Sequence, residues 1–477
     1  MNLVFLALMA IVAAAWSQAL WGRWGAVLSL TLASLTPLSI AMAYFVGNDL
    51  AAAAMGIALL FVSFQYLVRP STFKAIVVGT LGGAAATTKY SLMTLLPVAA
   101  LALLCSRLIV TEGTGERSDR VAGLRLATAA GRRTLLDIAL AAGCGWLVIW
   151  MAYGFTNGIP FVPGFESPLL AAASRVLPDL FLLGLDRSVE YASVGYVSFL
   201  TGEAYVGGRW PYFPLTYIVK TPLPEMLLVL AGGVLAARLL WTWRRSRVGV
   251  AALATLGLGG LLYGYSLLTS QLNIGFRHAL PLLPILAVMA GAGARVRSRG
   301  SVAVVSLLIT WVVAEALLSH PHQLSYCNQL AGGTRGCHRY VGDSSIDWFG
   351  QDLGRLATFQ RTRQTGPIYL SRYSFTYPAA FGIEAFAIAT PEVFEGALKT
   401  GVLHWVAVPK PALQTPGIFP ERDRLCELLR YEPVPFEGKG MWMFAIVPER
   451  QRHPAPMAEI NACRARARIQ LPKNRWN

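Results

Sequence analysis

A few charged residues stand in otherwise apolar surroundings along the chain. Asp49 lies in "AYFVGNDLAAAAMG" and is the only charged residue between Arg23 and Arg69. A carboxylate that faces lipid at mid-membrane costs roughly 2.5–3.5 kcal/mol, so we expect Asp49 to face a watery cavity. There it can accept a proton from a hydroxyl group as a general base, or help to position an acceptor or a metal ion. The sequence does not decide whether a divalent cation such as Mg²⁺ or Mn²⁺ takes part.

Basic residues occur in similar surroundings. Lys89 lies in "ATTKYS", and Arg277 and His278 lie in "LNIGFRHALP". Lysine and arginine are suited to holding a phosphate group, so we predict that Lys89, Arg277 and His278 bind a phosphate. We further expect Asp49, Lys89 and Arg277 to line one pocket. The alternative for each charge is a snorkelling anchor at the end of a membrane span.

Two further stretches combine aromatic and charged residues, "FLTGEAYVGGRWPYFPLTYIVKTPLP" and "DSSIDWFGQDL". We predict that these two stretches line a substrate or acceptor pocket. Its candidate residues are Glu203, Tyr212, Lys220, Asp343, Asp347, Trp348 and Gln351.

The composition is that of an integral membrane protein. Of the 477 residues, 55% are hydrophobic and 14% are charged, with a mean hydropathy of +0.50, whereas soluble domains carry about 25% charged residues. The net charge of +16 is explained by basic loops on one face of a membrane. We therefore predict membrane lipids, and no nucleic acid, as partners.

The apolar segments predict about ten membrane spans, at about 2–20, 26–46, 50–68, 75–88, 91–106, 135–152, 223–241, 249–268, 280–293 and 302–319. Some are shorter than the roughly 20 residues of a straight span, so their ends must extend into the flanks. Connections rich in Lys and Arg alternate with poor ones. The positive-inside rule assigns the basic set to the cytoplasm. Asp49, Lys89, segment 153–222, "SQLNIGFRH" and everything after about residue 320 then lie outside.

A carboxylate and phosphate-binding cations at the outer face fit one substrate class, a polyprenyl-phosphate sugar. Its phosphate lies at the membrane interface and its tail lies in lipid. Because no soluble nucleotide sugar exists outside the cell, glycosyl transfer there must use a lipid-linked donor.

Two domains are expected. Residues 1–320 form a helical membrane bundle, interrupted by an outer segment, 153–222, in which we expect short helices on the membrane surface. Residues 321–477 form a small extracytoplasmic α/β domain. Its strand-like runs are "GPIYLS", "LHWVAVP" and "MWMFAIVP", and its helical stretches lie at about 348–362, 391–399 and 421–429. The tail "CRARARIQLPKNRWN" is expected to be frayed, either solvated or touching anionic lipid.

Four of the six cysteines lie in the outer domain. In bacteria, the space outside the inner membrane is oxidising. Four cysteines allow three pairings. We favour Cys327–Cys337 and Cys426–Cys463 over the other pairings and over free thiols. Cys105 and Cys144 fall in membrane spans and are expected to be inert.

Several stretches, taken in order, resemble the bacterial GT-C-type glycosyltransferases, the polyprenyl-phosphate-dependent enzymes akin to protein O-mannosyltransferases and the lipid A aminoarabinose transferase. They are "TPLSIAMAYFVGNDLAAAA", "GGAAATTKYSLMTLLP", "YVGGRWPYFPLTYIVKTPLP", "LNIGFRHALPLLP" and "HPHQLSYCNQLAGG" with "DSSIDWFGQDL". The resemblance covers about residues 30–355. It implies a multi-helix bundle with extracytoplasmic active-site loops, and inverting sugar transfer from a lipid phosphate with an aspartate as base.

The chain departs from the family pattern at three places. The family's principal acidic pair lies in a first outer loop that this chain lacks, and Asp49 matches the family's second acidic site. Met42 and Tyr44 stand where relatives often have His and Arg. Ser345 and the inserted Phe349 break the D-S-N-x-D-W-G-Q-D pattern. We therefore expect a chain without its first helix and first acidic loop, or a divergent member without activity.

The sequence thus predicts a multi-pass transferase of the bacterial inner membrane with a GT-C-like bundle. It transfers a hexosyl or pentosyl group from a polyprenyl-phosphate donor to an extracytoplasmic lipid, glycan or protein. The alternatives are a lipid-linked polysaccharide polymerase or ligase and a non-catalytic accessory protein. A transporter is less favoured, because we find no internal hydropathy repeat.

Overall fold

A computed structural model describes residues 2–45, 47–106, 120–157, 167–296, 298–348, 350–371, 377–387, 403–416, 423–446 and 457–469, with the side chains of 120–130, 347–348 and 423–424 left undescribed. The chain divides into two compact units. The helical unit comprises Met1–Glu190, Pro224–Leu267 and His278–Leu317. The second unit comprises Tyr191–Leu223, Leu268–Arg277 and Leu318–Asn477. Two short segments from the first 320 residues therefore belong with the C-terminal part.

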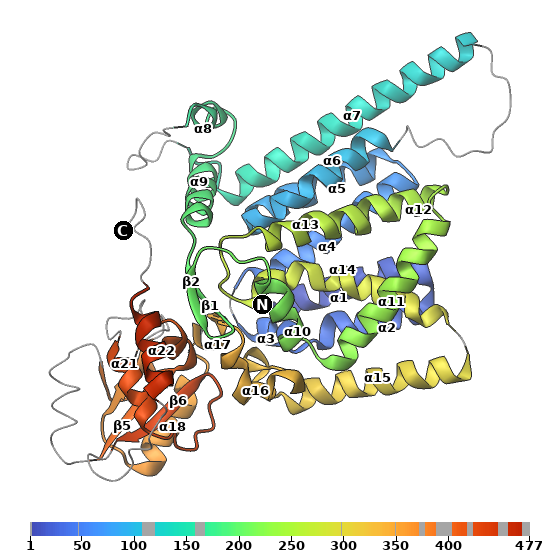
Figure 1. Cartoon of the computed structure of the whole chain (residues 1–477). Coiled ribbons are helices and arrows are strands. Elements are labelled where there is room, and N and C mark those ends of the chain that lie inside the picture. The colour runs from blue at the N-terminus through green and yellow to red at the C-terminus, as the bar shows by residue number, and fades with distance from the viewer. Residues whose placement is uncertain are drawn as a thin grey trace. The chain divides into compact units, whose positions relative to one another are not determined.

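Helices coincide with every apolar segment that the sequence singled out. Figure 1 shows them along the chain, and their bounds are α1 (Asn2–Trp21), α2 (Arg23–Leu35), α3 (Pro37–Tyr44), α4 (Asp49–Val68), α5 (Thr72–Thr88), η1 (Tyr90–Leu95), α6 (Leu96–Cys105), α7 (Arg120–Ala152), α11 (Leu223–Thr242), α12 (Arg247–Ala252), η2 (Leu253–Gly257), α13 (Leu258–Leu268), η3 (Phe276–Leu282), α14 (Leu283–Ala290), η4 (Gly291–Arg295) and α15 (Arg299–Leu318).

Length and hydropathy make this a multi-pass membrane protein. In the described part of the chain, seven helices are long and apolar enough to cross a membrane, or eight if the bent pair α2–α3 counts as one span. The bend of 55° falls at Thr36, where Pro37 starts a new helix because proline fits the first helical position. Helix α5 has 17 residues, about 26 Å of rise, and Tyr90–Cys105 is also shorter than a full span.

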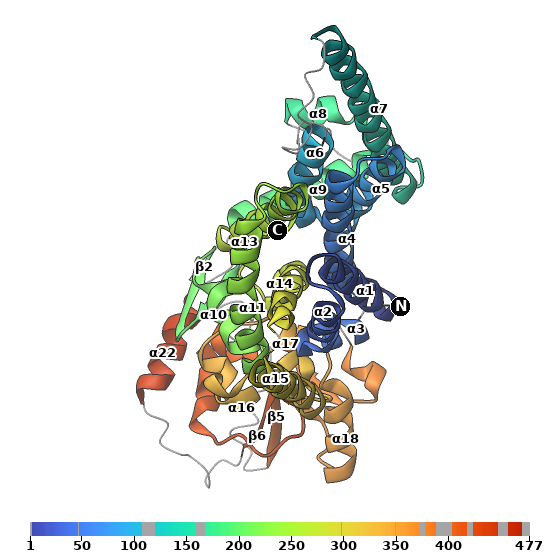
Figure 2. The ribbon, with the colours of Figure 1, turned by 90° about the vertical axis from the view of Figure 1, so that its right-hand side faces the viewer.

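Helix α4 lies at the centre of the helical unit. It contacts α1, α5, α6, α12 and α14, and its first turns carry the buried run Ala51–Ala54. Such small side chains let neighbouring helices approach closely. Helices α5 and α7 lie side by side in Figures 1 and 2. A Cβ atom on Gly79 of α5 would lie 2.0 Å from the Ala141 carbonyl oxygen of α7, so this crossing requires glycine.

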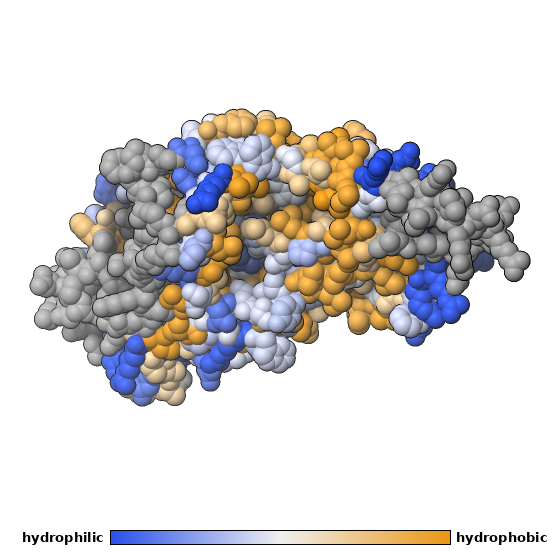
Figure 3. All heavy atoms as spheres, turned by 90° about the horizontal axis from the view of Figure 1, so that it is seen from above, coloured by the Kyte–Doolittle hydropathy of each residue, from blue (hydrophilic) through white to orange (hydrophobic). Residues whose placement is uncertain are grey.

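Apolar side chains are also exposed in large numbers. Figure 3 shows hydrophobic residues over much of the face in view. The exposed large hydrophobic residues of α7 are Leu135, Leu136, Trp146, Leu147 and Met151. An exposed apolar surface of this extent is typical of helices that face lipid.

The segment 153–222 contains more than the expected short helices. Its described part holds α8 (Pro168–Ala173), α9 (Asp179–Val194), the antiparallel hairpin β1 (Val197–Leu200) and β2 (Glu203–Val206), and α10 (Tyr212–Lys220). The sequence reading missed the hairpin. Its turn, Thr201–Gly202, has positive φ at both residues, which suits a tight connection between antiparallel strands.

The second unit contains a four-stranded sheet in the order β4-β3-β5-β6. Strand β3 (Ile368–Leu370) pairs in parallel with β4 (Ala385–Ala387) and β5 (His404–Pro409), and β5 pairs antiparallel with β6 (Met441–Ile446). Three of these strands match the expected runs, and β4 was missed. This is the small α/β domain that the sequence predicts.

Both faces of this sheet are covered. Val406 and Val408 of β5 pack in one apolar cluster with Leu425, whereas Ala407 packs in a second cluster with Leu356. The alternation follows the two-residue period of a strand. Leu356 belongs to α18 (Leu353–Arg363), and Leu425 belongs to α21 (Asp423–Glu427), which η10 (Leu428–Arg430) continues. The helix expected at 391–399 lies outside the described residues.

Two disulfides join elements of the second unit. Cys327 pairs with Cys337, and Cys426 pairs with Cys463, which is the pairing that the sequence favoured. Cys463 lies in α22 (Met457–Ala467). The expectation of a frayed tail is therefore wrong for residues 463–467, because the disulfide and the buried Ile460 hold this helix. Residues 470–477 lie outside the described part.

Candidate functional site

Asp49 and Lys89 form an ion pair in the helical unit. The Lys89 Nζ lies 2.5 Å from the Asp49 Oδ1. Asp49 stands in the first turn of α4, and Lys89 caps the C-terminus of α5. Each charge is thus at the helix end whose dipole favours it. Asp49 is only 6% exposed. The positive charge of Lys89 explains why this carboxylate is tolerated between two apolar helices.

Side-chain amides hold the chain on either side of this pair. Asn48 donates from Nδ2 to the Thr88 carbonyl oxygen at 2.9 Å, which ties the start of α4 to the end of α5. The buried Asn2 of α1 donates to the carbonyl oxygens of Met42 and Gly47 at 3.1 and 3.2 Å. These bonds fix the connection between α3 and α4. These bonds help to place Asp49 beside Lys89.

Tyr263 brings a third group to this part of the helical unit. Its hydroxyl donates to the His278 carbonyl oxygen at 3.0 Å, and it lies close enough to Asp49 for an electrostatic interaction. The sequence reading missed Tyr263, because this residue lies inside the apolar run 249–268, where no charged residue drew attention to it. Arg277 belongs to the second unit, and its approach to Lys89 stays a prediction.

This arrangement can perform two kinds of chemistry. A carboxylate held in a largely buried site is suited to accept a proton from a hydroxyl group, and a lysine is suited to bind a phosphate as a point charge. In the described part of the chain, no group of three or more His, Cys, Asp and Glu side chains is placed to hold a metal ion.

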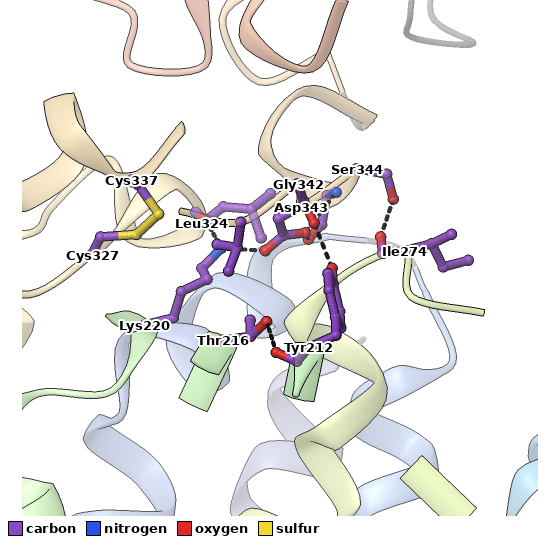
Figure 4. Close-up of polar contacts among 12 residues, drawn as sticks. Tyr212, Thr216, Lys220, Ile274, Leu324, Cys327, Cys337, Gly342, Asp343 and Ser344 are labelled. Atoms are coloured by element: carbon purple, nitrogen blue, oxygen red, sulfur yellow. Dashed lines mark hydrogen bonds and ion pairs between the residues drawn. A yellow bond between two sulfur atoms is a disulfide. The ribbon is translucent and has the colours of Figure 1, made fainter. Parts of the chain in front are cut away.

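A second buried ion pair lies in the second unit (Figure 4). Lys220, at the end of α10, contacts the Asp343 carboxylate and donates to the Leu324 carbonyl oxygen at 3.1 Å. Lys220 is 3% exposed and Asp343 is fully buried. The sequence reading placed both residues in one pocket. Because each is enclosed and satisfied by protein groups, we interpret the pair as a positioning element.

The backbone around Asp343 is tied to two distant segments. Tyr212 donates from its hydroxyl to the Gly342 carbonyl oxygen at 2.5 Å, and Ser344 bonds the Ile274 carbonyl oxygen. Gly275 adopts φ +150°, and a Cβ atom there would lie 2.6 Å from the Asp343 Oδ1. The loop that leads into Arg277 is therefore held against the Asp343 carboxylate.

The electrostatics of Asp343 favour its charged form. Burial by itself raises the pKa of the carboxyl group, but the charge and hydrogen bond of Lys220 and the hydrogen bonds of Ser345 lower it. The resulting pKa lies below the ordinary value. The pair is thus a true ion pair at neutral pH, which a buried carboxylate requires.

The other predicted pocket residues are less closely joined. Glu203 is exposed and forms an ion pair with Arg209 at 2.8 Å. Gln351 is half-buried, and the side chains of Asp347 and Trp348 lie outside the described part. These residues stay predictions.

Three buried carboxylates inside the helical unit were not singled out from the sequence. Asp137 accepts from the Tyr66 hydroxyl at 2.7 Å, Glu225 accepts from Thr36 at 3.0 Å, and Glu315 accepts from the Trp311 indole at 3.0 Å. Single acidic residues within apolar runs were the available signal. Each bonds a different hydroxyl or indole group.

The chain matches no protein-family model, and no curated protein matches it. It is similar to the crystal structure of ArnT from Cupriavidus metallidurans bound to undecaprenyl phosphate, with a TM-score of 0.39 and 14% identity over 94% of this chain and 83% of that chain. The apo structure of the same protein gives a TM-score of 0.38 and 15% identity over the same shares. Similarity at this level carries no argument about activity.

Proposed function

We propose that this protein is an integral-membrane glycosyltransferase. It transfers a sugar from a polyprenyl-phosphate donor to an acceptor hydroxyl on the outer face of the bacterial inner membrane. The observation that carries the proposal is the partly exposed Asp49–Lys89 pair at adjoining helix ends of a membrane bundle. A base beside a phosphate-binding cation, at the end of apolar helices, suits a substrate whose phosphate is anchored by a lipid tail.

The reaction assigns a separate role to each residue. The acceptor oxygen attacks the anomeric carbon, and the bond from that carbon to the phosphate oxygen breaks. The lipid phosphate leaves with the bonding electrons, and Lys89 stabilises its charge. Arg277 and His278 stay the further phosphate-binding residues that the sequence predicts. The acceptor proton goes to Asp49. Configuration at the anomeric carbon inverts, because one displacement completes the transfer.

Donor binding must change the Asp49–Lys89 contact. A lipid phosphate competes with Asp49 for the Lys89 ammonium group, because both are anions and the contact is direct. Once Lys89 turns to the phosphate, Asp49 is released from its partner and becomes a better proton acceptor. Removal of a neighbouring cation raises the basicity of a carboxylate.

A turnover assay tests this proposal. The purified protein is incubated with a panel of undecaprenyl-phosphate sugars and a cell-envelope extract, and release of undecaprenyl phosphate is measured by mass spectrometry. We expect release from at least one donor, lowered about 10²–10⁴-fold by Asp49→Asn, the usual contribution of a general base. Release that is equally fast in Asp49→Asn would overturn the role of Asp49.

The polymerase or ligase alternative uses the same donor chemistry and differs in its acceptor, so the sugar-bearing product of this assay separates the two. A non-catalytic accessory protein predicts binding of undecaprenyl phosphate without release from any donor.

A further inference from the structure

The second unit contains a large basic cavity that the proposed reaction does not use. Its volume is about 780 Å³, and its walls come from the β1–β2 hairpin, residues 335–339, the start of α20 (Lys410–Gln414), β6 and α22. The lining cations are Arg335, Arg339, Lys410 and Arg466, against the carboxylates Glu432 and Glu459. Burial lowers the pKa of the lining His338 to about 4, so that this imidazole is neutral at pH 7. The cavity therefore carries a surplus of positive charge.

Lys410 is the most unusual of these cations. It is 5% exposed, and its Nζ donates to the Thr334 carbonyl oxygen at 3.2 Å and lies 4.9 Å from the centre of the Trp442 ring. In the described part of the chain it forms no ion pair. Burial is the main reason that its pKa is lowered to about 8; Asp352 opposes this shift, and Lys439 and Arg335 add to it. A buried ammonium group without a carboxylate partner is costly, and an anion in the cavity would offset that cost.

Arg466 extends the basic wall from α22. It donates to the carbonyl oxygens of Gly202 and Leu413 at 3.3 and 3.2 Å, and its guanidinium lies 5.6 Å from the centre of the Phe199 ring. These contacts hold the guanidinium in place at the cavity wall. The Cys426–Cys463 disulfide in turn fixes the helix that carries it.

Aromatic side chains line the same cavity. Tyr431, Trp442 and Phe444 contribute to its wall. A second cavity of about 460 Å³ shares Arg335, Lys410 and Trp442 with the first. Lys410 and Trp442 therefore line both cavities. Rings that lie beside cations suit a ligand with apolar C–H faces as well as anionic groups.

We propose that this cavity binds an anionic carbohydrate, a sugar that carries a phosphate or carboxylate group. Lys410 and Arg335 hold the anion, and Trp442 contacts the sugar ring. The anionic character of the ligand follows from the charges alone, whereas its being a sugar rests on the proposed function.

Saturation-transfer NMR on the full-length protein in detergent tests the proposal, with glucose 6-phosphate as probe and glucose and inorganic phosphate as comparisons. We expect transfer to the ring protons of glucose 6-phosphate, weak transfer to glucose, and competition by inorganic phosphate. Lys410→Gln should weaken binding about tenfold, the effect of losing one charge-assisted contact. Arg335→Gln, at an exposed position, gives a second variant that does not disturb packing.

Arg361 provides the matched control. It is exposed on α18 and lines neither cavity, so Arg361→Gln removes the same charge and should leave binding unchanged. Equal binding in wild type, Lys410→Gln and Arg335→Gln would overturn the proposal, as would an equal loss in Arg361→Gln. Inorganic phosphate bound as tightly as glucose 6-phosphate, without transfer to ring protons, would overturn the sugar assignment. Because the readout is binding, failure of this proposal and failure of the turnover assay are distinguishable.

Discussion

At the scale of single residues, the structure separates two lysine–carboxylate pairs by their burial. Lys89 retains 15% side-chain exposure beside Asp49, whereas Lys220 and Asp343 retain 3% and 0%. A partly exposed pair can exchange its partner for a substrate, and a fully buried pair cannot do so without losing its place in the fold. We therefore assign chemistry to the first and positioning to the second.

Breaking the Lys220–Asp343 pair should destabilise the second unit. Asp343→Asn leaves the Lys220 ammonium buried without a counter-charge, which costs about 3–5 kcal/mol. The double variant Lys220→Met/Asp343→Leu removes both charges and should recover most of that loss. Denaturant unfolding in detergent, followed by hydrogen exchange in residues 338–348, measures both. A double variant less stable than Asp343→Asn would contradict this account.

The pair also predicts a pH dependence. The folded-state pKa of Asp343 lies below its ordinary value of 3.8, so the folded state binds fewer protons than the unfolded state as pH falls through this region. The contribution of the pair is fully present above the ordinary value and is lost as pH falls toward the folded-state pKa. The stability of Lys220→Met/Asp343→Leu should fall less steeply below pH 4 than that of wild type.

At the scale of elements, helix ends and one loop carry the site. Helices α4 and α5 were predictable from their apolar runs, and the terminal positions of Asp49 and Lys89 followed from them. The loop 273–276 was not predictable, because its anchors are Ser344 and Asp343, some seventy residues later. The sequence marked both "LNIGFRHALP" and "DSSIDWFGQDL" as candidate site stretches, but it did not predict that they contact each other. The β1–β2 hairpin was missed because aromatic and glycine-rich composition concealed two short strands.

Gly275 gives a test of that loop. Its φ of +150° and the 2.6 Å approach of the Asp343 Oδ1 leave no room for a Cβ atom, so Gly275→Ala should destabilise the second unit by about 1–3 kcal/mol. A Cβ atom on Gly354 of α18 would meet no atom within 4 Å, so Gly354→Ala is the control in which we expect no loss of stability. Equal stability of the two variants in thermal unfolding would show that the loop is not held as described.

At the scale of the whole molecule, charge alternation predicts that residues 153–222 and the C-terminal part lie on the same, extracytoplasmic side. Hydropathy anticipated the apolar helices α1–α7 and α11–α15, and oxidising-compartment reasoning anticipated the two disulfides. The sequence could not anticipate that Tyr191–Leu223 and Leu268–Arg277 pack with the C-terminal part. That division depends on contacts between residues far apart in the chain, such as the Ser344 bond to Ile274.

Labelling with a membrane-impermeant thiol reagent in spheroplasts tests the topology. In a background without Cys105 and Cys144, cysteines at the exposed positions Ser167 and Thr362 should both react. A cysteine at Ser298, in a connection that we assign to the cytoplasm, should react only after the membrane is permeabilised. Reaction at only one of Ser167 and Thr362 would contradict the assignment.

The central claim is that Lys89 binds the phosphate of a polyprenyl lipid, and native mass spectrometry with undecaprenyl phosphate and undecaprenol tests it most directly. Lys74 lies near the opposite end of α5, so Lys74→Ala is the matched control. We expect wild type, Lys74→Ala and Asp49→Asn to bind undecaprenyl phosphate more tightly than undecaprenol. Lys89→Ala should lose about tenfold in affinity for the phosphate lipid alone. Unchanged binding in Lys89→Ala, or equal binding of the two lipids by wild type, would contradict the account.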